Sequence, residues 1–279
     1  PEDYRAFLHS FAWLRDLAEV GKEAKKETGV SVFAEASMRD WLDHYTQFDA
    51  LAWRADIVGE RIIFLTSYAP LFLSTNDLVY RSKVLNALAR HARHLYRTAA
   101  RITRGMPRIK AATGLIYSGL LLPGSQARRI RGEAILTREL SQFVFADGGV
   151  ETRAPDDMLN IVMLMIALRN IYRNLDEQIP DTVQTTIDRL IPALKATIHG
   201  DGGLASFHGS RPGFADLLNQ AFKLSESSGK AMDNGALSGF QRMACGKSIV
   251  ILDAGPPPAT PYSHSAHASI LSFEFSHKK

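Results

Sequence analysis

Apolar residues recur at steps of three and four along most of the chain, the spacing that places them on one face of an α-helix. In the segment Leu85–Arg104 they share one face, and an arginine stripe lies on the opposite side. The apolar face consists of Leu85, Leu88, Ala92, Leu95, Ala99 and Ile102, and the arginine stripe of Arg90, Arg97, Arg101 and Arg104. Gly105 and Pro107 predict the end of this helix. We interpret the stripe as a solvated face, with a groove for a polyanion as the alternative.

The same periodicity predicts further amphipathic helices joined by short connections. They cover Tyr4–Lys25, Phe33–His44, Phe48–Ser67, Ile109–Leu121, Gly132–Phe145, the apolar face from Met158 to Leu168, the face from Val183 to Ile198, and Phe214–Phe222. Helical hairpins packed side by side bury such faces well. Trp13, Trp41 and Trp53 lie within these patterns, so we expect core positions for them rather than platforms for sugars.

Two glycine-containing stops, sequences predicted to terminate a helix, interrupt the helical pattern. They are separated along the chain by about the length of one helical hairpin. They read Asp147-Gly148-Gly149 and Asp201-Gly202-Gly203. Glycine suits the left-handed conformation that ends many helices, and the spacing predicts a weak repeat of a helix pair. A calcium loop is a poor interpretation, because the alternating carboxylates that such loops require are missing.

The pattern changes after about Gly235. Short β-rich segments follow at Phe240–Ala244, Ser248–Leu252 and Ser269–Phe275, and Gly246-Lys247 predicts a hairpin between the first two. Two or three strands cannot form an independent sheet domain. We therefore expect a helical domain over residues 1–235 and, over residues 236–279, the first strands of a second domain in a longer protein.

Composition adds few constraints. The chain has 279 residues, 46% of them hydrophobic and 22% charged, and a formal net charge of +4, which is typical of a globular protein and compatible with an acidic partner. A single cysteine, Cys245, excludes an internal disulfide, and we expect it to be buried rather than a nucleophile. No apolar run is long enough to cross a membrane, so we expect no membrane insertion. The opening residues do not resemble a signal peptide, and without an initiator methionine they look processed.

Four stretches, in order, carry a family resemblance. They are Gly114–Leu120, Asp147–Pro155, His199–Phe207, and the pair Ile251–Gly255 with His264–Glu274. Together they resemble the heparinase II/III-like family of polysaccharide lyases. The resemblance implies a mainly α fold, an α/α toroid of helical hairpins followed by the start of an antiparallel β-sandwich. It also implies a bacterial periplasmic protein, with the cytoplasm as the alternative.

The resemblance further implies eliminative cleavage of a uronic-acid polysaccharide. This chemistry needs a donor that neutralises the C5 carboxylate, a base that takes the C5 proton, and an acid that protonates the leaving oxygen. In the family the first role falls to an Asn or His of the toroid, and proton transfer to a Tyr and a sandwich His.

The chain departs from that set of residues. Where the family keeps its Asn or His, Arg108 is the only group able to neutralise a carboxylate, and the family's Tyr falls at Asp157. The first sandwich His falls at Ser265 with His264 beside it, the second at His267, and the family's Asp at Ser269; this last change weakens the case for a metal site. Three alternatives follow: other residues fill the catalytic roles, the protein binds the polysaccharide without cleaving it, or it catalyses another reaction.

The candidate catalytic residues are His267, His264, Tyr262 and His208, and the candidate substrate-binding residues are Arg108, Arg153, Arg211 and Arg104. Histidine is the side chain most easily tuned to proton transfer near neutral pH. Each candidate has a plain alternative. Surface exposure is the alternative for the histidines and for the loop that carries His208 and Arg211. For Tyr262 the alternative, which we favour, is that its ring packs against other side chains. Capping of carbonyl groups, or pairing with Glu151 or Asp157, is the alternative for Arg153.

We therefore expect a polysaccharide lyase that acts by β-elimination on an acidic polysaccharide. The alternatives are a non-catalytic carbohydrate-binding or envelope-associated protein on the same scaffold and, more weakly, a helical scaffold for a protein partner. No cofactor is required for the elimination. A structural zinc ion in the complete β domain would use His267 together with residues beyond position 279. Nucleic acid is not expected as a partner, because no basic motif interleaved with aromatic residues is present.

Overall fold

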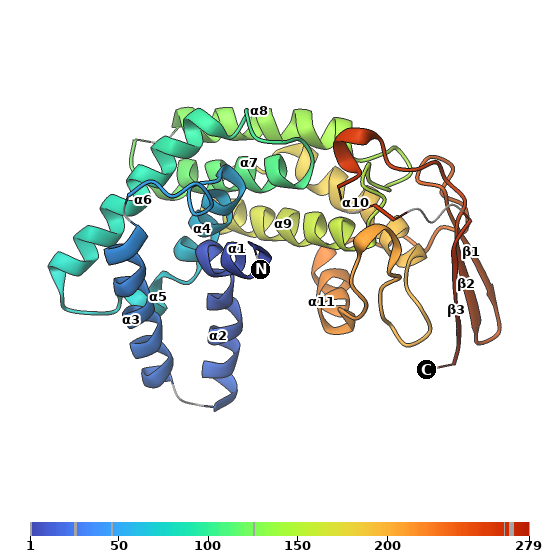
Figure 1. The fold of residues 1–279 in the computed structure, drawn as a ribbon, viewed down its shortest axis with the longest axis horizontal. Helices are drawn as coiled ribbons and strands as arrows, with labels where there is room; N and C mark the ends of the chain where they lie inside the picture. Colours follow the sequence, from blue (N-terminus) through green and yellow to red (C-terminus); the bar gives the residue numbers. More distant parts are fainter. Residues whose placement is uncertain are drawn as a thin grey trace. The chain divides into compact units, whose positions relative to one another are not determined.

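The computed structural model describes residues 2–24, 27–45, 47–124, 126–264, 266–267 and 271–278 (Figure 1). In these ranges the chain forms eleven α-helices, two short 3-10 helices and one antiparallel sheet of three strands. The backbone contacts divide it into two compact units, residues 1–103 with 107–136, and residues 104–106 with 137–279. The predicted domain boundary at residues 235 and 236 stays a prediction.

The first unit holds seven helices and the start of an eighth. They are α1 (Glu2–Ser10), α2 (Trp13–Ala24), α3 (Glu27–Tyr45), α4 (Ala55–Ser67), α5 (Ala69–Leu73), α6 (Leu78–Thr98), α7 (Met106–Leu121) and the beginning of α8 (Gln126–Phe143). Helix α4 packs against α1 and α6, and α3 packs against α2 and α5. The mainly helical prediction for this region is confirmed.

Two glycines explain part of the Gly114–Leu120 stretch, one of the four that carry the family resemblance. A Cβ atom on Gly114 of α7 would lie 2.4 Å from the Cα atom of Gly59 in α4. A Cβ atom on Gly119 would lie 2.4 Å from the backbone nitrogen of Arg129 in α8. The motif therefore lets α7 cross two neighbouring helices with its backbone in contact with theirs.

Some predicted boundaries in the first unit are wrong. The segment predicted as one helix over Tyr4–Lys25 is divided into α1 and α2, because Phe11 adopts the left-handed region at φ 61°. Helix α6 begins at Leu78, where the Asp77 carboxylate caps the helix by accepting the Tyr80 N–H at 3.0 Å. Leu85 lies at the edge of the buried face and is 53% exposed.

The second unit is built on a helical hairpin. Helix α9 (Pro155–Asn174) and helix α10 (Asp181–Ala196) lie side by side, and α11 (Ala215–Ser225) packs against α9 (Figure 1). Nearly every residue of the two predicted apolar faces is buried. These residues are Met158, Ile161, Val162, Met165 and Leu168 on α9, and Val183, Ile187, Leu190, Ile191 and Leu194 on α10.

The two Asp-Gly-Gly stops form the same tight loop. In each, the Asp carboxylate accepts the N–H of the second glycine, at 3.1 Å for Asp147 and 2.8 Å for Asp201. The first glycine of each, Gly148 or Gly202, has a positive φ, as predicted. The loops follow the helix ends by several residues and close with short β-bridges, so they are hairpin-like turns rather than helix caps.

The sheet contains β1 (Phe240–Cys245), β2 (Ser248–Asp253) and β3 (Phe273–His277) in that order, and all neighbours are antiparallel (Figure 1). Cys245 pairs with Ser248, which confirms the predicted hairpin. Cys245 itself is exposed, so the prediction of a buried thiol is wrong: it stands at the turn, away from the packed end of β1 around Phe240. The start of the predicted third strand, including Ser269, lies outside the described residues.

Candidate functional site

Asp253 at the end of β2 is the centre of a buried ionic cluster with Arg153 and His208. Its Oδ1 accepts a hydrogen bond from the Arg153 guanidinium, and its Oδ2 accepts one from His208 Nε2 at 2.7 Å. Arg153 also donates to the carbonyl oxygens of Ser238 at 2.9 Å and Pro256 at 2.5 Å. The three charged or polar side chains of this Asp253 cluster are at most 3% exposed.

The backbone around the Asp253 cluster is shaped to admit the guanidinium. A Cβ atom on Gly255 would lie 2.4 Å from Arg153 Nη2, and one on Gly239 would lie 2.8 Å from the same atom. Arg153 and His208 both adopt the left-handed region, at φ 56° and 50°, which is uncommon for such side chains. The tight loops that precede both residues bring them to β2 from different helices.

Electrostatics favour the charged form of Asp253. Burial alone would raise the pKa of its carboxyl, but the hydrogen bond from His208 and the charge of Arg153 outweigh burial and hold the pKa below its ordinary value. His208 Nδ1 is buried without a hydrogen-bond partner among the described residues.

Two expectations about this loop are corrected. Solvent exposure was the alternative to a functional role for the polar loop around His208, yet the imidazole is buried, with Asp253 as its hydrogen-bond partner. For Arg153 we considered Glu151 and Asp157 as partners, and its ionic partner is Asp253, a hundred residues away. In this arrangement neither Arg153 nor His208 is accessible to a polysaccharide.

A second cluster in the same unit is connected through Phe143, Gly105 and Glu139, and it includes two of the candidates, Arg104 and Tyr262. The Tyr262 ring lies 5.4 Å from the Phe143 ring, between centroids, at 58°. A Cβ atom on Gly105 would lie 2.9 Å from the Phe143 ring, so the glycine lets the Arg104 segment approach. The Phe143 cluster, which consists of Arg104, Glu139, Phe143, Glu151 and Tyr262, therefore joins a helix connection to the loop after β2.

Two carboxyl groups complete the Phe143 cluster. Glu139 is buried and accepts the Gly105 N–H at 2.6 Å, and its Oε1 lies 3.8 Å from Arg104 Nε. Burial raises the pKa of the Glu151 carboxyl above its ordinary value, and the charge of Arg104 opposes that shift only in part. The Arg104 side chain, held by Gln142, remains 43% exposed. The cluster thus combines an accessible cation, a half-buried phenol and a carboxyl that retains its proton to a higher pH.

The sequence analysis named Glu151 only as a possible partner of Arg153 and missed Glu139, although Glu139 carried a signal. Glu139 shares a predicted helix face with Leu136 and Phe143, and a carboxylate among core positions indicates a specific partner. Nothing in the local pattern distinguishes Glu151 from an ordinary loop residue.

The other candidates lie apart from these clusters or in exposed loops. His264 and His267 are exposed in the segment after the 3-10 helix Thr260–Tyr262, while Ser265, the position of the first family histidine, lies outside the described residues. Arg211 is exposed, with its guanidinium carbon 5.6 Å from the centre of the Phe214 ring. Arg108 belongs to the first unit, where its half-buried guanidinium donates to the Ile102 carbonyl oxygen at 2.6 Å.

A hydrogen-bonded pair, His199 and Glu274, attaches β3 to the loop that contains Asp201. His199 Nε2 lies 2.7 Å from Glu274 Oε2, and Glu274 Oε1 accepts the Ser206 N–H at 2.8 Å. Burial would raise the pKa of the Glu274 carboxyl, but the hydrogen bonds from His199 and Ser206 together lower it. Both residues lie in stretches that carry the family resemblance, although spacing along the chain gave no indication of this pairing.

None of the helices in the described ranges is long and apolar enough to cross a membrane. The same ranges contain no group of three or more His, Cys, Asp or Glu side chains arranged to hold a metal ion. His267 as a zinc ligand needs partners beyond position 279 and stays a prediction.

Comparison with known proteins places these motifs in a family. A profile described as "Heparinase II/III N-terminus" matches residues 1–225, and one described as "Heparinase II/III-like, C-terminal" matches residues 227–279. The chain belongs to the heparinase II/III-like family. The resemblance predicted from four short stretches is thereby confirmed.

Solved structures show the same fold. The heparinase II/III-like chain matches a crystal structure of heparinase III with a TM-score of 0.77 and 15% identity, over 97% of this chain and 48% of that one. It matches the heparan sulfate lyase HepC from Pedobacter heparinus with a TM-score of 0.62 and 19% identity, over 100% of this chain and 48% of that one. The fold is therefore the predicted one, an α/α toroid followed by the start of an antiparallel β-sandwich.

Among curated proteins, this heparinase II/III-like chain is similar to FtsZ-localized protein C of Caulobacter vibrioides. The two are 28% identical over 269 residues, which is 96% of this chain and 45% of that protein. The chain thus spans about half the length of the relatives it matches.

Proposed function

We propose that the protein recognises an acidic, uronic-acid-containing polysaccharide and cleaves it by β-elimination. The observation that carries the proposal is the Phe143 cluster, in which the phenol of Tyr262 packs against the Phe143 ring and the exposed cation Arg104 lies beside Glu139, on the heparinase II/III scaffold. The family membership and the heparinase III fold support a lyase, and one of the solved relatives, HepC, is a heparan sulfate lyase.

The proposed chemistry requires three events. A cation neutralises the C5 carboxylate, which makes the C5 proton acidic. A base removes that proton, and the electron pair left on C5 forms the C4–C5 double bond. The bond between C4 and the glycosidic oxygen breaks, and an acid delivers a proton to that oxygen. No bound metal or organic cofactor enters the balance.

The described residues suggest a division of these roles. Arg104 is a permanent cation that can pair with a carboxylate in a planar, two-point geometry, so we assign it the neutralising role. Tyr262 is the candidate for proton transfer, with His264 and His267 in the exposed segment that follows it. Glu151, whose carboxyl holds its proton to a higher pH than an ordinary glutamate, is a further acid candidate. Arg211 and Arg108 remain candidates for holding substrate.

Ultraviolet absorbance tests the activity, because elimination creates a conjugated, unsaturated product. The full-length protein is incubated with heparan sulfate and with alginate, and the Arg104→Ala variant is compared with Arg138→Ala, an exposed arginine on α8 outside the cluster. We expect Arg104→Ala to lower kcat/KM by about 10²–10³-fold and Arg138→Ala to leave it within about twofold. A folded Arg104→Ala variant with wild-type turnover would remove the Phe143 cluster from the active site.

A second candidate is binding of an acidic polysaccharide without cleavage. It is favoured by the departures at Arg108 and Asp157 from the family's catalytic residues, and by the similarity to a protein named for its localisation rather than for a reaction. Saturable, salt-sensitive binding with no ultraviolet product would support it. Surface charges are screened over about 8–10 Å near physiological salt, so affinity should fall as salt is added. Equal affinity for a neutral glycan, independent of salt, would reject an acidic ligand in both versions.

A further inference from the structure

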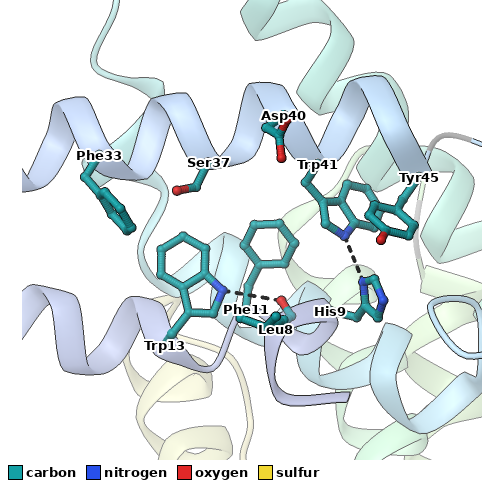
Figure 2. A pocket seen from close by; sticks show the side chains of 9 residues that line it. All are labelled: Leu8, His9, Phe11, Trp13, Phe33, Ser37, Asp40, Trp41 and Tyr45. Atoms are coloured by element: carbon teal, nitrogen blue, oxygen red, sulfur yellow. Dashed lines mark hydrogen bonds between the residues drawn. The ribbon is translucent and has the colours of Figure 1, made fainter. Parts of the chain in front are cut away.

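The first unit contains an open pocket of about 440 Å³ between its first three helices (Figure 2). Its lining comes from α1, α2 and α3 and from Phe11, the residue whose positive φ separates α1 from α2. A volume of this size is within the range of small-molecule sites. The Phe143 cluster belongs to the other unit, and none of its residues lines the pocket.

Aromatic rings form the walls of the pocket. Trp13 packs between Phe11 and Phe33, with ring centroids 5.4 and 6.1 Å apart, and Trp41 packs against Tyr45 at 5.9 Å. Trp41 is buried, as predicted for a core residue, whereas Trp13 is half-buried and Phe33 is 57% exposed. Trp13 and Phe33 therefore offer ring surface to a ligand, which is the opposite of our sequence-based expectation for Trp13.

The indole N–H groups of the pocket are already engaged. Trp13 Nε1 donates to the Leu8 carbonyl oxygen at 3.3 Å, and Trp41 Nε1 donates to His9 Nδ1 at 3.2 Å (Figure 2). Burial, followed by the charge of Arg61, lowers the pKa of His9, so this imidazole is neutral at physiological pH. The polar groups that α3 adds to the lining include the Ser37 hydroxyl and the Asp40 carboxylate, whose Oδ1 lies 3.3 Å from His44 Nδ1 at the exposed rim.

Charges around the pocket favour an ionic ligand of neither sign. The guanidinium of Arg61, fully buried, lies 4.4 Å from the centre of the Trp41 ring and donates to the carbonyl oxygens of His9 and Ala52 at 2.6 and 2.7 Å. Arg61 would repel a second cation that Asp40 attracts, and Asp40 would repel an anion that Arg61 attracts, so neither sign of ligand charge gains a clear advantage over an uncharged ligand.

We propose that this pocket binds an uncharged sugar ring. The C–H groups of a pyranose carry a small positive charge and form a flat apolar face, which suits the negative face of an indole or phenyl ring. Its hydroxyl groups are hydrogen-bond donors, and the carboxylate of Asp40 accepts only. The pocket supplies both halves of this recognition, with ring surface from Trp13 and Phe33 and acceptor oxygens from Ser37 and Asp40.

The test measures binding of two uncharged probes, cellotetraose and triacetylchitotriose, to the full chain by calorimetry and by tryptophan fluorescence. Tetramethylammonium and glucuronate serve as charged probes. The variants are Asp40→Asn, which keeps the size of the side chain but removes its charge, and Phe33→Ala, which truncates an exposed ring. Asp43→Asn is the matched control, an exposed carboxylate on the same helix that does not line the pocket.

We expect saturable binding of at least one uncharged probe, weakened about 10- to 100-fold by Asp40→Asn and about 2- to 10-fold by Phe33→Ala, with Asp43→Asn unchanged. Circular dichroism and thermal unfolding establish that the variants remain folded. Because the Phe33 side chain is exposed, Phe33→Ala tests the contribution of the aromatic walls to binding even if the Asp40→Asn substitution disturbs the fold. Failure of both uncharged probes to bind, tighter binding of either charged probe, or undiminished sugar binding in Asp40→Asn and Phe33→Ala would each overturn the proposal.

Discussion

Replacing Asp253 by asparagine tests whether the buried Asp253 cluster stabilises the second unit. The substitution keeps the shape of the side chain and removes its charge. Arg153 would then remain 3% exposed with no carboxylate to compensate it, and the His208 N–H would lose a charged acceptor. Asp233→Asn is the matched control, because Asp233 is an exposed aspartate in the same unit.

The expected loss is large because the partners cannot reach water. Removing one member of a buried ion pair typically lowers the free energy of unfolding by about 3–5 kcal/mol. At about 2–4 °C for each kcal/mol in a domain of this size, the melting temperature should fall by roughly 6–20 °C. Asp233→Asn should change the free energy of unfolding by no more than about 0.5 kcal/mol.

Urea and thermal unfolding, followed by circular dichroism at several pH values, provide the measurement. Because the folded protein lowers the pKa of Asp253, the stability it contributes is present above the ordinary aspartate value of about 4 and is lost as the pH falls through the folded pKa. The difference between the wild type and Asp253→Asn should therefore shrink in acid. A variant that melts within 2 °C of the wild type at pH 7, as the control does, would refute a stabilising role for the cluster.

The remaining predictions concern a loop, a pair and a candidate catalyst. Gly148→Ala should lower the free energy of unfolding, measured in urea titrations, by about 1–3 kcal/mol more than Gly202→Ala. Both glycines have a positive φ, but an added Cβ atom would lie 2.0 Å from a backbone oxygen at Gly148 and 3.9 Å from the nearest atom at Gly202. Equal losses of stability in the two variants would exclude the clash at Gly148. Glu274→Gln should speed amide hydrogen exchange in β3 above pH 4.3, and the effect should shrink as the pH falls through the lowered pKa of Glu274 in the folded protein. Unchanged exchange near pH 7 would show that the pair of Glu274 with His199 does not hold the strand. If the full-length protein is a lyase, His267→Ala should reduce turnover about 10²–10⁴-fold and alter the pH–rate profile, whereas wild-type kinetics would exclude His267 as acid or base.

Local periodicity was sufficient to predict most helices and the sheet. Nearly all residues of the predicted apolar faces of α9 and α10 are buried, because an amphipathic helix removes its apolar face from water by turning that face toward the core. The break at Phe11 was missed, since neither glycine nor proline marks it. The exposure of Cys245 was also missed, because burial at a hairpin end depends on what covers the strand rather than on residue type.

The candidate site was less predictable, because its contacts join distant parts of the chain. Arg153 and His208 were identified as unusual, but their common partner Asp253 lies 100 and 45 residues away, and no spacing rule links them. Arg104 and Tyr262 were named separately, and only the fold brings Tyr262 to Phe143 and Gly105, the neighbour of Arg104, to the same ring. Sequence patterns therefore selected some of the right residues without showing which of them meet.

The exposed Cys245 gives these 279 residues a single site for labelling with a thiol-reactive reagent. It is the one cysteine among 279 residues, and it stands at the turn between β1 and β2, so a maleimide dye or a nitroxide would attach at one known position. The neighbouring strand end, where Ser248 pairs with His277, lies within reach of such a reporter. A label here would record the mobility of the sheet's free end in the native sequence, with no engineered thiol and no background from other sites.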